Sequence, residues 1–187
     1  CKKALQDADG DMEKAAELLR ERGIAKAVKK EGRIAAEGVV GAYVNGNTGV
    51  LLEINCESDF VSKGDKFHGI VDSVAKVAAE NLPADVDALL ACPMEGGTVK
   101  DFITSQTAVI GEKISLRRFA IYQTEGKIET YIHMGGKVGV MVDAVDVAEG
   151  AEETLHDVAL QIAASRPSYI TKEEVPADVL AKEKEIL

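Results

Sequence analysis

The sequence predicts an α+β fold, in which a short helical segment precedes two related subdomains that each combine an antiparallel sheet with packed helices. Three observations support this class. Apolar residues recur at helical spacing over residues 12–19 and 66–80. Residues 39–44 and 50–55 resemble strands that flank a turn rich in asparagine and glycine at 45–49. A strand–turn–strand–helix pattern then occurs twice along the chain.

The first 23 residues predict two short helices. The first, over residues 2–8, ends at Asp9-Gly10, and Asp11 is placed to cap the second. We expect Gly23 to end the second helix. Two such helices bury too little surface to fold alone, so residues 1–23 are expected to be part of a helical domain, joined by a linker at 24–36 to the rest of the chain.

A first subdomain is predicted over residues 37–124. Its hairpin is followed by helical patterns at 66–80, 86–91 and 99–109, and then by a strand at 114–122. The helix at 66–80 has a broad apolar stripe, which predicts that it packs against one face of the sheet.

The second subdomain, residues 125–187, repeats the hairpin and helix of the first. The matches share residue type and order: Gly38 and Tyr43 with Gly126 and Tyr131 (88 positions apart), 49–53 with 139–143 (90 apart), and Asp72 and 77–79 with Asp157 and 162–164 (85 apart). The change from 88 to 90 predicts that the second hairpin turn is two residues longer. Chance likeness between two such units is the less favoured explanation.

The composition narrows the classes of partner. The formal net charge is -10, which disfavours direct binding to nucleic acid or to an anionic membrane surface. One basic cluster, Lys26, Lys29, Lys30 and Arg33, is interpreted as the solvated face of a helix rather than as a binding patch. No apolar run approaches the ~20 residues that span a bilayer.

Three widely spaced cysteines, Cys1, Cys56 and Cys92, predict neither a disulfide framework nor a zinc site, and they favour a reducing, cytoplasmic location. The chain begins at Cys1 without an initiator methionine. We therefore expect it to be a fragment of a longer protein.

No catalytic pattern stands out, and we expect a protein that is not an enzyme and that uses no cofactor or metal. His68, His133 and His156 lie on different predicted elements, and no phosphate-binding glycine loop is present. Cys56 has no histidine partner in the sequence and is interpreted as a buried structural thiol.

The segment Glu57–Val61 is the strongest candidate site. Phe60 stands between polar residues, so spacing leaves two interpretations open: a core anchor that holds the turn on the next helix, or an exposed interface anchor. The second repeat ends its strand pair at 144–149 with no comparable aromatic. This difference between the copies favours a specialised site.

Residues 55–61, Asn-Cys-Glu-Ser-Asp-Phe-Val, closely resemble the Asn-Cys-Glu-Thr-Asp-Phe-Val signature of the bacterial elongation factor Ts family. Residues 1–23 resemble the end of that family's ubiquitin-associated-like helical domain, and 26–38 resemble its linker. The segments 110–114, 117–118 and 163–167 also match. Ser58 replaces the usual threonine, and since both carry a hydroxyl we expect little change. The resemblance implies a chain truncated at both ends.

The resemblance implies a guanine-nucleotide exchange factor in translation elongation, which binds elongation factor Tu and promotes GDP release by disturbing its Mg²⁺ and phosphate site. The family's motif falls on Ser58, Asp59, Phe60 and Val61: Asp59 orients the turn, Phe60 acts as a wedge, and Val61 packs the turn. The His133 hairpin is a candidate second contact, as are the helices at 2–22. Whether the chain also forms a homodimer is not decided by the sequence.

Two other classes remain as alternatives. An adaptor or scaffold without exchange activity would bind through the N-terminal helices and would keep binding without Phe60. A small hydrolase would use Cys56 and a histidine, and would lose turnover on Cys56→Ala but not on Phe60→Ala.

Overall fold

The computed structural model describes residues 2–186 and confirms the α+β class. The helices are α1 (Lys2–Asp7), α2 (Met12–Val28), α3 (Asp59–Ser62), α4 (Asp65–Asn81), α5 (Val86–Ala91), α6 (Val99–Ile110), α7 (Glu152–Ser165) and α8 (Ala177–Ile186), with a 3₁₀ turn η1 (Lys172–Glu174). The strands are β1 (Glu37–Asn45), β2 (Thr48–Cys56), β3 (Pro93–Met94), β4 (Gly97–Thr98), β5 (Ser115–Gln123), β6 (Lys127–His133) and β7 (Val138–Ala144). The strands and helices predicted between residues 39 and 122 are thereby confirmed to within a few residues.

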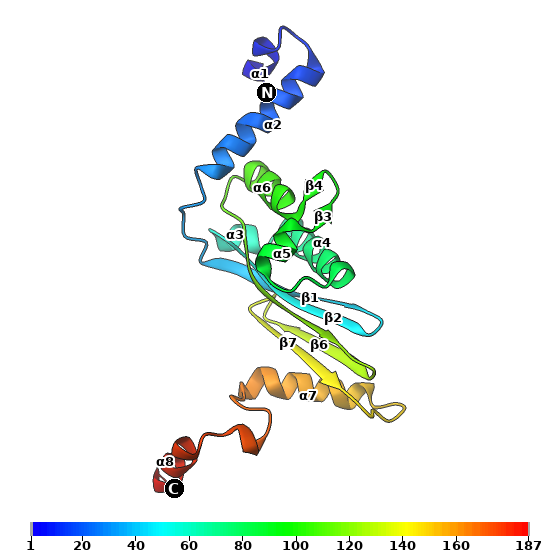
Figure 1. Ribbon diagram of the computed structural model, residues 1–187. Coiled ribbons are helices and arrows are strands. Elements are labelled where there is room, and N and C mark those ends of the chain that lie inside the picture. The colour runs from blue at the N-terminus through cyan, green and yellow to red at the C-terminus, as the bar shows by residue number, and fades with distance from the viewer. Residues whose placement is uncertain (1, 187) are drawn as a thin grey trace.

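The central part of the chain is built in layers (Figure 1). An antiparallel sheet in the order β1-β2-β5 carries α4 on one face, and the β6–β7 hairpin lies against its other face, with α7 packed on that hairpin. The α1–α2 pair and α8 extend from opposite ends of these layers.

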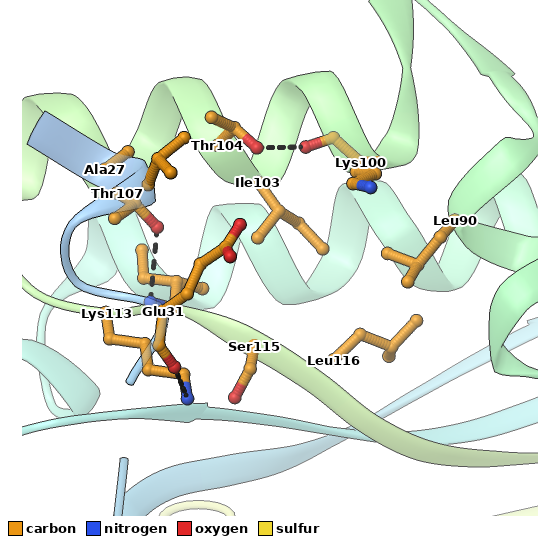
Figure 2. A pocket seen from close by; sticks show the side chains of 12 residues that line it. Ala27, Glu31, Leu90, Lys100, Ile103, Thr104, Thr107, Lys113, Ser115 and Leu116 are labelled. Carbon is orange, nitrogen blue, oxygen red and sulfur yellow. Dashed lines mark hydrogen bonds between the residues drawn. The ribbon is translucent and has the colours of Figure 1, made fainter. Parts of the chain in front are cut away.

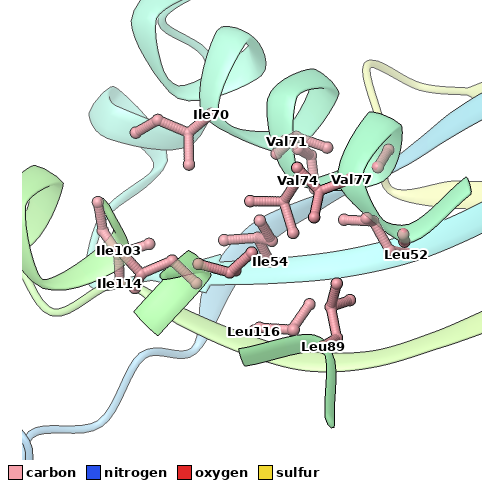
Figure 3. Close-up of a cluster of buried hydrophobic side chains, with 14 of the residues drawn as sticks. Leu52, Ile54, Ile70, Val71, Val74, Val77, Leu89, Ile103, Ile114 and Leu116 are labelled. Atoms are coloured by element: carbon pink, nitrogen blue, oxygen red, sulfur yellow. The ribbon is translucent and has the colours of Figure 1, made fainter. Parts of the chain in front are cut away.

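The main core lies between the sheet and α4. Figure 3 shows Ile54 of β2 beside Val74 of α4, in a buried cluster to which Leu52 of β2 and Ile70 of α4 also belong. Each such side chain stabilises the fold by about 1.5–3 kcal/mol through removal from water. This packing fixes β2, and therefore fixes the point at which the chain leaves the sheet after Cys56.

The other face of the sheet contacts the β6–β7 hairpin closely. The Val40 N–H donates to the Gly136 carbonyl across the two layers (2.7 Å). A Cβ added at Gly139 would lie 2.5 Å from Val40 Cγ1 and 2.9 Å from Leu51 Cδ1, so a side chain here would force these two side chains to shift. The two hairpins therefore pack as one block.

We call β1–β2 with α4 the first unit, and β6–β7 with α7 the second unit. Their registers correspond, because Tyr43 pairs with Val50 in the first and Tyr131 pairs with Val140 in the second. The turn Gly46–Asn47 of the first unit is replaced by Met134–Lys137 in the second, which confirms the predicted two-residue extension. The boundaries of the two predicted subdomains stay a prediction.

The glycines at which the repeat begins, Gly38 and Gly126, occupy equivalent places. A Cβ at Gly38 would lie 2.3 Å from the Ile54 carbonyl oxygen, and one at Gly126 would lie 1.9 Å from that of Ala144. In both units the first strand thus passes within van der Waals distance of the end of the second strand, which explains why the sequence repeats a glycine here.

The N-terminal helices begin as predicted, but α2 does not end at Gly23. Asp11 caps α2 by accepting the N–H groups of Glu13 and Lys14 (3.0 and 3.1 Å). The helix then continues to Val28, so the predicted stop is wrong. A Cβ at Gly23 would lie 3.1 Å from the Ala108 Cβ of α6, so this glycine permits close packing of α2 on α6.

Within residues 2–186, no helix combines the length and the apolar character required to cross a membrane.

Candidate functional site

The chain turns sharply after β2 into the single helical turn α3, which carries Phe60. The Phe60 side chain is 88% exposed, so its interpretation as a core anchor is wrong. Its neighbours point the other way: Val61 packs against the core cluster, and Ser62 is buried with its hydroxyl donating to the Asp59 carbonyl (3.2 Å). The turn therefore exposes one aromatic ring to solvent, while the next two residues anchor its backbone to the core.

Ser58 precedes α3 as its N-cap and uses its hydroxyl twice. The Ser58 Oγ accepts the Val61 N–H (3.4 Å) and donates to Glu112 Oε1 (2.6 Å). A hydroxyl can donate and accept at once, so serine and threonine are both suited to this position. The expectation that serine in place of threonine changes little stays a prediction.

Glu112, in the loop between α6 and β5, accepts two further hydrogen bonds from the start of this turn. The Glu57 and Ser58 N–H groups donate to Glu112 Oε2 (3.1 and 2.9 Å). With the Ser58 hydroxyl, three donors thus converge on one carboxylate. Hydrogen bonds to an ionised acceptor are shorter and stronger than those between neutral groups.

Glu57 reaches back to the same loop. The Lys113 backbone N–H donates to Glu57 Oε1 at 2.6 Å and lowers the pKa of Glu57, and the Arg33 guanidinium, 3.2 Å away, acts in the same direction. The turn and the loop at 111–113 are therefore joined reciprocally, each supplying an acid to the backbone of the other.

The Asp59 side chain forms an ion pair with Lys63. Its carboxylate lies 2.7 Å from the Lys63 ammonium, which lowers the pKa of Asp59 and raises the pKa of Lys63. Both side chains are solvent-accessible, and ion pairs of this kind contribute little to stability. The orienting role implied for Asp59 stays a prediction.

Sequence reasoning missed Glu112, Lys113 and Lys30 as parts of this site. The prediction that Lys30 and Arg33 lie on a helix face is wrong, because α2 ends at Val28 before both residues. Lys30 Nζ instead donates to the Gly111 carbonyl, and Arg33 pairs with Glu57. The only signal for Glu112 was its place in the segment 110–114 that resembles the family.

Cys56 lies under the turn and is fully buried. Its thiol donates to the Ser58 carbonyl (3.3 Å), and burial, followed by the charge of Glu112, raises its pKa to about 11. Since the thiolate is the nucleophilic form, the Cys56 of this structure is poorly suited to the hydrolase alternative.

His133 lies at the exposed end of β6, on the second unit. The Tyr131 hydroxyl and His133 Nδ1 are 2.8 Å apart, and His156 of α7 bonds to Glu129 at 2.8 Å. The Tyr131 ring meets the His156 ring edge-on. The structure thus brings two of the three histidines to one face, and the role of His133 as a second contact stays a prediction.

A cavity of about 290 Å³ lies where the end of α2 meets α6 and β5 (Figure 2). Ile103 and Leu116 supply apolar lining, and Lys100 and Glu31 also line it. Neither histidine nor cysteine is among the residues described around it. Across residues 2–186, we find no cluster of three histidine, cysteine or acidic residues that could hold a metal ion.

Comparison with known proteins gives one consistent result. A family model described as elongation factor TS matches residues 57–187. The elongation factor Ts of Janthinobacterium sp. (strain Marseille) is 49% identical over 187 residues, covering 100% of this chain and 62% of that relative. Those of Lactiplantibacillus plantarum and Chromobacterium violaceum are 48% and 46% identical, again covering 100% of the chain and 63% of each relative. The chain thus spans less than two thirds of the length of these relatives.

Proposed function

The chain belongs to the elongation factor Ts family, and from this premise we propose that it is a cytoplasmic guanine-nucleotide exchange factor for elongation factor Tu. It acts by binding, without a reaction of its own. The observation that carries the proposal is the exposed Phe60 ring on a turn whose backbone is held by Glu112.

An exposed phenylalanine is costly to present to water and useful at an interface. Burying its side chain against a partner contributes about 1.5–3 kcal/mol. A turn whose backbone is already held loses little backbone freedom on docking, so more of this free energy remains for binding. The geometry of α3 supplies both conditions.

In the proposed mechanism, the ring of Phe60 enters the GTPase domain and displaces the groups that hold Mg²⁺ and the phosphates of GDP. Val61 and Ser62 keep the turn packed on the core while the ring contacts the partner. Linkage requires reciprocity: if the bound chain weakens GDP binding by some factor, GDP weakens binding of the chain by the same factor. GDP then leaves, and GTP can replace it.

The test is release of a fluorescent GDP analogue from elongation factor Tu, measured with and without the chain. We expect the chain to accelerate release, and Phe60→Ala to reduce the acceleration by ~10- to 100-fold because the buried apolar area is lost. The matched control is Val145→Ala, which removes another exposed apolar side chain (67% exposed) on the loop after β7.

Two results would count against the proposal. Binding to elongation factor Tu without faster release would favour the adaptor class. Acceleration that survives Phe60→Ala unchanged would exclude the wedge, even if exchange activity itself is present.

A further inference from the structure

We propose that Glu112 is a positioning residue for nucleotide release, which holds the turn so that Phe60 is presented in one orientation. This inference rests on the proposed function. Glu112 does not need to touch the partner: its effect passes through the backbone of Glu57 and Ser58 to α3.

Within the turn, the Ser62 and Lys63 N–H groups donate to the Ser58 and Asp59 carbonyls (3.2 and 3.1 Å), but these bonds join the turn only to itself. The capping bond from the Val61 N–H to Ser58 Oγ is long at 3.4 Å, and the Asp59–Lys63 pair is exposed to solvent. A helical turn of four residues has little stability by itself. By contrast, the three bonds to the Glu112 carboxylate measure 3.1, 2.9 and 2.6 Å, and they fix both the backbone and the side chain of the capping residue.

Glu112 is itself held on both sides. Gly111 ends α6 at a φ of +87°, a conformation that favours glycine, and its carbonyl accepts Lys30 Nζ. On the other side, Lys113 Nζ donates to the Glu31 and Arg33 carbonyls (2.7 and 2.9 Å), as Figure 2 shows for Glu31. The carboxylate is thus presented from a loop anchored to the segment that follows α2.

This loop also continues into the core. The Ile114 N–H donates to Thr107 Oγ1 of α6 (3.2 Å), and both residues are buried (Figure 2). Glu112 therefore links α6 and β5 to a turn that otherwise packs on β1, β2 and α4.

The variant to test is Glu112→Gln, which keeps the size of the side chain. Glutamine has one acceptor oxygen, so it replaces one carboxylate oxygen of Glu112. Its NH₂ group replaces the other and cannot accept the hydrogen bond that this oxygen accepted. The matched control is Asp101→Asn at the opposite end of α6. Asp101 also accepts a backbone N–H and a hydroxyl, both from Thr98 (2.9 and 2.7 Å), but it caps a helix that does not carry Phe60.

Two measurements on the full chain decide the matter: GDP release from elongation factor Tu, and amide hydrogen exchange of Glu57, Ser58 and Val61 in the free chain by NMR. We expect Glu112→Gln to reduce the acceleration of release about tenfold, the scale of one lost charge-assisted hydrogen bond, and to speed amide exchange at Ser58. Asp101→Asn should change neither.

The double variant separates positioning from a general loss of structure. If Glu112 acts through the ring, Phe60→Ala with Glu112→Gln should release GDP no more slowly than Phe60→Ala alone. Additive losses would overturn the inference, as would full acceleration by Glu112→Gln. If the unmodified chain does not accelerate release, the proposed function fails. The positioning of the turn is then judged by amide exchange alone. An exchange rate at Ser58 that Glu112→Gln leaves unchanged would overturn the positioning role of Glu112.

Discussion

The first and second units have the same strand register but bury very different amounts of their helices. Seven residues of α4 are buried, whereas Ala159 is the one buried residue of α7 among those described. The strand ends differ too. After β2 the chain enters a turn braced by Glu112, while after β7 it enters a loop in which Val145 is exposed.

This contrast teaches where an interface residue can be placed. An exposed aromatic that docks on a partner needs a backbone that stays in place on contact. In the first unit, α4 packs on the turn and the loop at 111–113 is hydrogen-bonded to it. The second unit has the same topology without that support. Shared topology therefore does not by itself provide a rigid site.

The largest effect should come from equivalent helix positions in the two units. Ile70 of α4 and Leu155 of α7 are 85 positions apart, as the repeat requires, and have side chains of equal carbon number. We expect Ile70→Ala to lower the free energy of unfolding by about 2–5 kcal/mol, because it opens a cavity in the main core, and Leu155→Ala by less than ~1.5 kcal/mol, because Leu155 is half-buried. Urea denaturation measures both, and equal losses would contradict the contrast.

A second, smaller effect concerns the contact between the units. A Cβ at Gly136 would lie 2.6 Å from the Val39 Cβ, whereas one at Gly135 would meet nothing within 4 Å, although both glycines have positive φ. Gly136→Ala should therefore cost about 1–3 kcal/mol more than Gly135→Ala and should speed amide exchange at Val40. If the two variants melt alike, the close approach is not needed.

The ion pair between the units should matter less. Lys137 Nζ lies 2.6 Å from Glu37 Oε2, and both side chains are exposed. We expect Lys137→Gln to lower the free energy of unfolding by ~0.2–1 kcal/mol at low salt, with the difference shrinking as salt screens the charges. A larger loss that is insensitive to salt would show that Lys137 acts through its contact with the Gly38 carbonyl instead.

The smallest effect is local and depends on pH. Because the pKa of Glu57 is lowered in the folded chain, its bond to the Lys113 N–H is present at neutral pH and is lost as the pH falls below the ordinary glutamate value of ~4.3. The Lys113 amide resonance should titrate in that range, and Glu57→Gln should abolish the titration. An unchanged resonance in the unmodified chain would contradict the assignment.

Local patterns were sufficient to predict most of the fold. The apolar stripe of α4, the turn at Gly46–Asn47 and the cap at Asp11 are local signals, and each is confirmed. Gly23 misled because its low helix propensity was outweighed by packing of α2 against Ala108, a contact that no local pattern records.

The candidate site was harder to predict than the fold. The sequence singled out the segment that carries Phe60, but spacing could not decide between burial and exposure for one aromatic among polar residues. Glu112 could not be assigned from the sequence because it is 54 positions from Ser58, and two of its three hydrogen bonds come from backbone groups, which leave no trace in residue type. Long-range contacts of this kind require the structure.

The thiol of Cys56 makes the turn observable without any label. It donates to the Ser58 carbonyl in the closed turn, where its raised pKa keeps it protonated and its burial keeps reagents out. Each opening of the turn that breaks this bond would let the thiol ionise more readily and react. The rate of thiol modification would then report how often the turn opens, and so how often Phe60 leaves the orientation in which it meets a partner.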